Sequence, residues 1–183
     1  GPLHVMQSEL AAEVGIGLLG SMIVRQDDGR RFNTCALFDR DGAHLHSYRK
    51  IHIPEEPGFW ESSHYEADTT PPAPVDAFGL SLGIQICSDV NRPSGSLLLA
   101  ARGAQCILAP RSTELATWWK WRPVLVANAL TSCSYVLTVN RPAPEFGVLI
   151  GGPSFAVSPR GEVLPESTDP VVVVEIDSAE VDL

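Results

Sequence analysis

The chain has 183 residues, of which 44% are hydrophobic and 19% are charged, and we expect residues 1–183 to form one domain with a sizeable core. Its formal net charge is -9 at pH 7, which argues against nucleic acid and against an anionic membrane surface as partners. No apolar run approaches the ~18 residues that a membrane-spanning helix needs.

The first third of the chain predicts one helix followed by an antiparallel meander. Apolar residues recur at helical spacing between Leu3 and Val14, and Gly15 is a natural C-terminal stop. Residues 16–24 are apolar almost throughout, which predicts a strand covered on both faces. Two further strands are expected over residues 31–39 and 43–49.

A long irregular stretch, IHIPEEPGFWESSHYEADTTPPAPVD, covers residues 51–76. Loops of this length are uncommon in compact domains unless they cover a site, so we interpret this stretch as a pocket wall.

The next segment predicts a strand, a tight bend and a helix. Apolar residues alternate from Leu80 to Ile86, and Pro93 suits the first turn of a helix that Gly103 would close. Cys87 therefore lies on the bend, where nearby backbone N–H groups favour a thiolate nucleophile and a developing oxyanion. A cysteine at a strand end is also commonly just a small buried hydrophobic residue.

The remainder alternates between short strands and a helix. Strands are expected over residues 105–110, 134–140 and 171–176, a helix over 114–131, a proline-rich loop over 141–147, and a hairpin that turns at 159–161. Helices between central strands, with meanders at both ends, predict the α/β class with a mixed sheet.

The four cysteines are widely spaced and form no C-x-x-C pair, which predicts neither a metal site nor a disulfide framework. We therefore expect a reducing, cytoplasmic location and no metal or other cofactor. The cysteines are Cys35, Cys87, Cys106 and Cys133.

Several motifs in one order together resemble the carbon–nitrogen hydrolase (nitrilase) superfamily, with an amidase- or carbamoylase-like character. They are YRKIHIP at 48–54, GIQICSD at 83–89, GAQCILAP at 103–110, VANAL at 126–130, VLTVNR at 136–141 and GGPSFAVSPRGEVL at 151–164. The resemblance implies an α-β-β-α sandwich. It also implies attack by a cysteine on an amide, carbamoyl or nitrile carbon, with a glutamate base and a lysine beside the oxyanion.

By this resemblance, Cys87 matches the family nucleophile and Lys50 the family lysine, which would stabilise the oxyanion together with the backbone N–H of Ser88. Glu61 aligns with a second glutamate that positions substrate in many members. Asp89 is expected to cap the following helix rather than to take part in catalysis.

Two departures from the family pattern affect function. The strand–helix–strand unit that carries the general-base glutamate is not found before Leu3, and Glu9 and Glu13 lie on the following helix and are no substitute. The chain is thus expected to be either a segment of a longer protein or a shortened relative that cannot complete the reaction alone. After Cys87 the family's arginine is displaced by one position and its glutamate is missing, which leaves the substrate class open.

The predicted function is hydrolysis of a small linear amide or N-carbamoyl compound through a cysteine thioester. The alternatives are nitrile hydrolysis, a catalytically inactive nitrilase-like domain for binding or assembly, and a Cys–His thiol hydrolase that uses His52. The resemblance also implies a homodimer or higher homo-oligomer. Three tryptophans, Trp118, Trp119 and Trp121, are more than one helical face can bury, so at least one should be exposed or lie at an interface.

Overall fold

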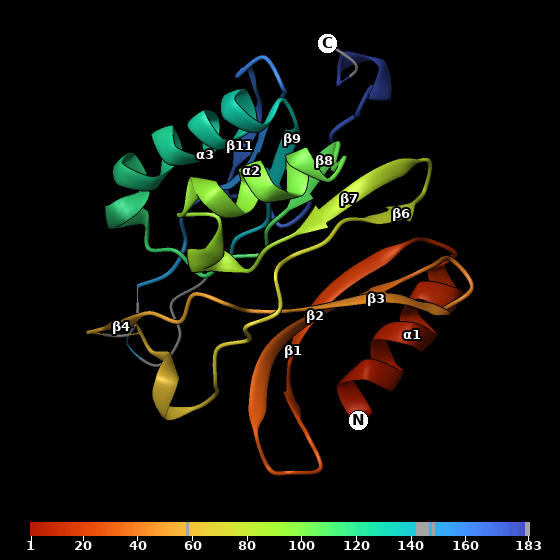
Figure 1. Cartoon of the computed structure of the whole chain (residues 1–183). Helices are drawn as coiled ribbons and strands as arrows, with labels where there is room; N and C mark the ends of the chain where they lie inside the picture. The colour runs from red at the N-terminus through yellow and green to blue at the C-terminus, as the bar shows by residue number, and fades with distance from the viewer. Residues whose placement is uncertain (58, 142–146, 148, 182–183) are drawn as a thin grey trace. The chain divides into compact units, whose positions relative to one another are not determined.

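The computed structural model describes residues 1–57, 59–141, 147 and 149–181, and the chain divides into two units (Figure 1). The first unit comprises residues 1–71 and 75–79, and the second comprises residues 72–74 and 80–183. Each unit has its own cluster of buried apolar side chains. Both units contain strands and helices, so the α/β class predicted from the sequence is confirmed.

The first unit consists of a helix on an antiparallel meander. Its elements are α1 (Pro2–Val14), β1 (Leu18–Arg25), β2 (Arg31–Phe38) and β3 (His44–Arg49), with the strands in the order β1-β2-β3. Gly15 ends α1 in the left-handed conformation, with φ at 71°, where glycine carries no steric penalty. The helix and the meander predicted from the periodicity are therefore confirmed.

The predicted burial of the first strand on both faces is wrong. Along β1, Met22 is buried beside Ala11 of α1, whereas the next residue, Ile23, is 49% exposed. Successive side chains of a strand point to opposite faces, so the helix covers only one face of β1.

Residues 50–79 contain only short elements. They are β4 (Glu55–Glu56), β5 (Phe59–Trp60), the 3₁₀ helix η1 (Glu61–Ser63) and β6 (Val75–Ala77). A backbone hydrogen bond from Glu66 N–H to Arg31 O fastens this stretch to the meander, and one from Asp68 N–H to Lys50 O joins two parts of the stretch itself. Its role as a pocket wall stays a prediction.

The second unit holds a mixed sheet with two helices. The strands β7 (Leu80–Ile84), β8 (Cys106–Leu108) and β9 (Tyr135–Thr138) are parallel, and β10 (Ser154–Val157) and β11 (Val163–Ser167) continue antiparallel in the order β11-β10-β9-β8-β7. Helices α2 (Pro93–Ala101) and α3 (Trp118–Ser132) lie side by side (Figure 1). Short 3₁₀ helices are η2 (Cys87–Asp89), η3 (Leu115–Thr117) and η4 (Ser178–Glu180).

The core of the second unit joins the helices to the sheet. Leu99 of α2, Leu125 of α3 and Val136 of β9 are all fully buried in one apolar cluster. Trp118 belongs to the same cluster, whereas Trp119 is 77% exposed, which confirms that one face of α3 cannot bury all three tryptophans.

The predicted last strand is wrong. Residues 171–176 form no strand in the described chain, and Val171 and Val173 are 78% and 85% exposed. The valine-rich pattern is typical of a strand, but a strand also needs a neighbour with which to exchange backbone hydrogen bonds. The loop expected over 141–147 includes residues 142–146, which lie outside the described residues.

Candidate active site

Lys50 is fixed in the first unit by its backbone and its side chain. It follows β3 directly, its N–H donates to Asn33 O at 2.9 Å, and its carbonyl accepts from Asp68 N–H at 2.9 Å. The side chain is fully buried, which is rare for a lysine unless it is paired with a carboxylate.

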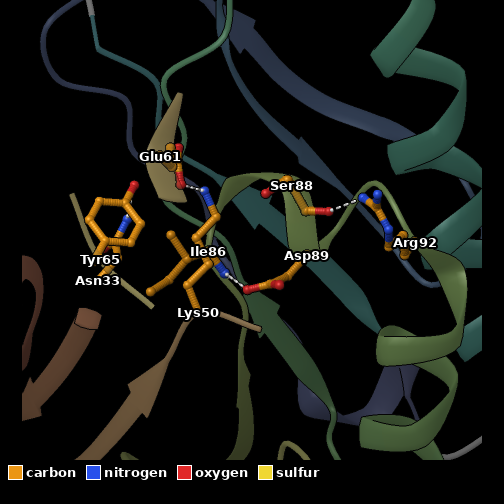
Figure 2. A network of polar contacts seen from close by, with 8 residues as sticks. All are labelled: Asn33, Lys50, Glu61, Tyr65, Ile86, Ser88, Asp89 and Arg92. Carbon is orange, nitrogen blue, oxygen red and sulfur yellow. Dashed lines mark hydrogen bonds and ion pairs between the residues drawn. The ribbon is translucent and has the colours of Figure 1, made fainter. Parts of the chain in front are cut away.

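Glu61 supplies that carboxylate. Lys50 Nζ donates to Glu61 Oε2 at 2.5 Å, and the glutamate side chain is 17% exposed (Figure 2). Glu61 begins η1, and its carbonyl accepts the N–H groups of His64 and Tyr65, so one turn of backbone fixes its position. The structure therefore brings together two of the residues that sequence analysis selected.

Cys87 lies in the second unit at the bend after β7. Its φ is 49°, in the left-handed region that non-glycine residues rarely adopt. Such backbone strain costs about 1–3 kcal/mol and persists only where surrounding contacts hold it. One of these contacts is the hydrogen bond from Cys87 N–H to Pro110 O at 2.9 Å, which ties the bend to the end of β8.

Two buried side chains hold the same bend. The carboxylate of Asp89 accepts the N–H of Ile86 at 3.1 Å (Figure 2), and Asn128 of α3 donates to Val90 O at 2.5 Å. The sequence predicted that Asp89 caps the following helix, α2. Asp89 instead caps η2, because its carboxylate reaches back to Ile86, the residue before Cys87. The predicted strand–bend–helix is otherwise confirmed.

Ser88 is buried, and its carbonyl accepts a hydrogen bond from Arg92 Nη1 at 3.1 Å (Figure 2). Arg92 is the arginine whose displacement set this chain apart from the family pattern. It lies against the backbone of the turn that contains Cys87. The donation of the Ser88 N–H to an oxyanion stays a prediction.

Sequence analysis missed Arg111, which follows Pro110 at the end of β8. Its guanidinium is buried, donates to Thr113 Oγ1 at 3.2 Å and Pro153 O at 2.8 Å, and lies over the ring of Trp118. Burial lowers the pKa of Arg111 to about 10, and attraction to Cys87 opposes that shift. The sequence feature that could have pointed to Arg111 is a single arginine directly after a short apolar strand.

The four cysteines are not joined in disulfides and lie in different environments. Cys35 and Cys106 are buried, and burial raises the pKa of Cys106 to about 12. Cys87 is partly exposed and Cys133 is exposed. In the described ranges, no group of three or more His, Cys, Asp or Glu side chains could hold a metal ion.

None of the helices in the described part of the chain combines the length and the apolar character needed to cross a bilayer.

The sequence profile of the carbon-nitrogen hydrolase family matches residues 6–183. An omega-amidase of Xenopus tropicalis is 31% identical over 184 residues, which cover 96% of this chain and 65% of the relative. The chain thus spans slightly less than two thirds of the length of that relative.

Solved structures show the same fold. A carbon-nitrogen hydrolase from Helicobacter pylori G27 matches 99% of this chain and 69% of its own, with a TM-score of 0.90 at 23% identity. An amidase mutant from Nesterenkonia sp. AN1, in which acrylamide has added to the active-site cysteine, matches 91% of this chain and 64% of its own, with a TM-score of 0.85 at 27% identity. The predicted nitrilase-like fold with mixed sheets is therefore confirmed.

Proposed function

The chain belongs to the carbon-nitrogen hydrolase family, and from this premise we propose that it carries the nucleophile of a thiol hydrolase that cleaves a small linear amide or N-carbamoyl compound. The observation that carries the proposal is the strained bend at Cys87. Cys87 has a left-handed backbone conformation, and contacts from Pro110, Asp89 and Asn128 hold its bend in place. Such a conformation is energetically unfavourable for a residue that only fills space.

The proposed reaction has two stages. Cys87 Sγ attacks the carbonyl carbon as a thiolate, and the carbon–nitrogen bond breaks as the tetrahedral intermediate collapses to a thioester. The leaving nitrogen takes a proton, and water then hydrolyses the thioester to the acid. A carboxylate base must move these protons. That role is not assigned to Cys87, Ser88, Lys50 or Glu61.

Lys50 and Ser88 are assigned to the oxyanion. The ammonium of Lys50 and the backbone N–H of Ser88 would stabilise the negative oxygen of both tetrahedral intermediates. Glu61 forms the ion pair with the buried lysine and is assigned to substrate positioning.

The test of the nucleophile uses acrylamide, the reagent found on the cysteine of the Nesterenkonia amidase. We expect peptide mass mapping to find the first adduct on Cys87, and Cys87→Ser to abolish it. Cys133→Ser is the matched control because Cys133 is the exposed competitor. Adducts on Cys133, Cys35 or Cys106 ahead of Cys87 would make the assignment wrong.

A second readout decides the substrate class. Ammonia release by the protein in its natural length should occur with linear amides or N-carbamoyl amino acids and disappear in Cys87→Ala. Turnover of nitriles alone would instead support the nitrilase alternative.

We also propose a cytoplasmic homodimer or higher homo-oligomer. The free thiols support a reducing compartment, and the exposed Trp119 supports an interface on α3. Sedimentation velocity at micromolar concentration should show a species larger than the monomer, and Trp119→Ser should weaken it. A strict monomer would contradict the assembly without affecting the assignment of Cys87.

A further inference from the structure

The ion pair of Lys50 and Glu61 joins a residue that the sheet fixes to one that lies on a short turn. Lys50 follows β3, and its N–H donates to Asn33 O of β2 at 2.9 Å, so its backbone is held by the meander. Glu61 begins η1, a 3₁₀ turn of only three residues in an irregular stretch. A turn this short does not hold itself in place, so the position of Glu61 depends on contacts outside η1.

Tyr65 makes such contacts just after the turn. Its N–H donates to Glu61 O at 3.1 Å, and its hydroxyl accepts a hydrogen bond from Asn33 Nδ2 at 3.4 Å (Figure 2). Asn33 and Tyr65 are both partly buried, which limits the competition of water for this hydrogen bond. The next residue, Glu66, donates its N–H to Arg31 O at 2.8 Å. Two hydrogen bonds therefore fasten the segment that follows Glu61 to β2.

These hydrogen bonds form a closed circuit around the ion pair. The carbonyl of Asn33 accepts the N–H of Lys50, and the side chain of Asn33 donates to Tyr65. Tyr65 in turn donates its N–H to Glu61, and the ion pair from Lys50 Nζ to Glu61 Oε2 closes the circuit. Asn33 therefore supports both members of the pair from one position on β2.

We propose that Tyr65 and Asn33 are positioning residues of the active site, and that their hydrogen bond holds the turn so that the Glu61 carboxylate meets the Lys50 ammonium in one geometry. A buried ion pair is favourable only when its geometry is good, and a small displacement of a catalytic group lowers the rate. Neither side chain is assigned a contact with the substrate. The inference rests on the proposed function, in which Lys50 serves the oxyanion and Glu61 positions the substrate.

The test is a double-mutant cycle of Tyr65→Phe with Glu61→Gln, measured as ammonia release from a linear amide by the protein in its natural length. Tyr65→Phe removes only the hydroxyl and should lower kcat/KM about fivefold, the size of one neutral hydrogen bond. Most of the loss should lie in kcat, because the ammonium acts on the tetrahedral intermediate. In the Glu61→Gln background, Tyr65→Phe should change kcat/KM by less than about twofold, because Tyr65 acts through Glu61.

Two further variants separate this hydrogen bond from other effects. Asn33→Ala should lower kcat/KM by a similar factor and add little to Tyr65→Phe, because both remove the same hydrogen bond; it also covers the case in which Tyr65→Phe does not fold. Tyr135→Phe is the matched control. It removes a tyrosine hydroxyl that donates to Glu180 in the second unit, and it should leave kcat/KM unchanged.

Urea unfolding supplies the same cycle where Glu61→Gln leaves too little activity to measure. Tyr65→Phe should shift the unfolding equilibrium about fivefold in the wild-type protein and clearly less in Glu61→Gln. Equal losses in the two backgrounds would overturn the inference and leave Cys87-dependent ammonia release standing. Absence of that release would instead overturn the proposed function, and the urea cycle would still decide whether Tyr65 acts through Glu61.

Discussion

At the scale of single residues, the Lys50–Glu61 pair is more shielded from water than the Arg30–Asp28 pair of the same unit. The lysine is fully buried and the glutamate is 17% exposed, whereas the side chains of Arg30 and Asp28 are half exposed. Breaking a buried pair leaves an uncompensated charge, whereas exposed pairs contribute little.

Glu61→Gln should therefore destabilise the protein by about 3–5 kcal/mol in urea unfolding. Asp28→Asn, which breaks the exposed pair, is the control and should leave the urea midpoint unchanged. Combining Glu61→Gln with Lys50→Met should recover much of the loss, because no buried charge then lacks a partner. A single Glu61→Gln variant with wild-type stability would show that the lysine has another counter-charge.

Sequence alone could select some site residues and not others, for a physical reason. Cys87, Ser88 and Lys50 lie in short local motifs, and the resemblance of those motifs to the carbon–nitrogen hydrolase family selected them. Arg111 is held in its buried position by the carbonyl of Pro153, which is 42 residues away in the chain. Contacts of that kind form only in the folded sheet, and no local pattern encodes them.

At the scale of elements, the contact between α1 and β3 contains histidines. The ring of His4 lies 4.8 Å from Phe38 and 5.3 Å from His44, measured between ring centroids. Burial, then His44 and the N-terminal amine, lower the pKa of His4, and burial, then His44, lower that of His46.

These shifts predict a loss of stability in mild acid. The folded-state pKa values lie below the unfolded value of about 6.5, so the unfolded chain binds more protons as the pH falls through that value. The stability that these histidines contribute is present above the unfolded-state pKa of about 6.5. It is lost as the pH falls through the folded-state pKa values. His4→Gln should flatten the dependence of the thermal midpoint on pH in this window, whereas His64→Gln, at an exposed position outside the cluster, should not.

Element prediction succeeded where local signals were sufficient. The spacing from Leu3 to Val14 with Gly15 defined α1, and the turn at 159–161 defined the hairpin of β10 and β11. It failed at residues 171–176, because a run of valines specifies a strand only when a sheet edge accepts it. The side chains of this segment do alternate in exposure, and just beyond its end Tyr135 Oη donates to Glu180 Oε2 at 2.6 Å.

At the scale of the whole molecule, the chain has two compact units, and the single domain expected for residues 1–183 from composition stays a prediction. Composition reports the total amount of apolar surface and not how that surface is divided between cores. The family profile nevertheless extends across both units, from residue 6 to residue 183. The Lys50–Glu61 ion pair belongs to the first unit, and Cys87, the proposed nucleophile, belongs to the second.

The bend at Cys87 also has a consequence for folding. Its contacts reach Pro110, which follows β8, and Asn128 of α3, and both lie far along the chain, so the strand–bend–helix segment cannot hold Cys87 in the left-handed conformation by itself. Contacts of such sequence separation form late, because the chain must first lose the entropy of closing long loops. We therefore expect the backbone geometry at Cys87 to be acquired at the end of folding and, in mild denaturant, to be lost before the helices themselves unwind.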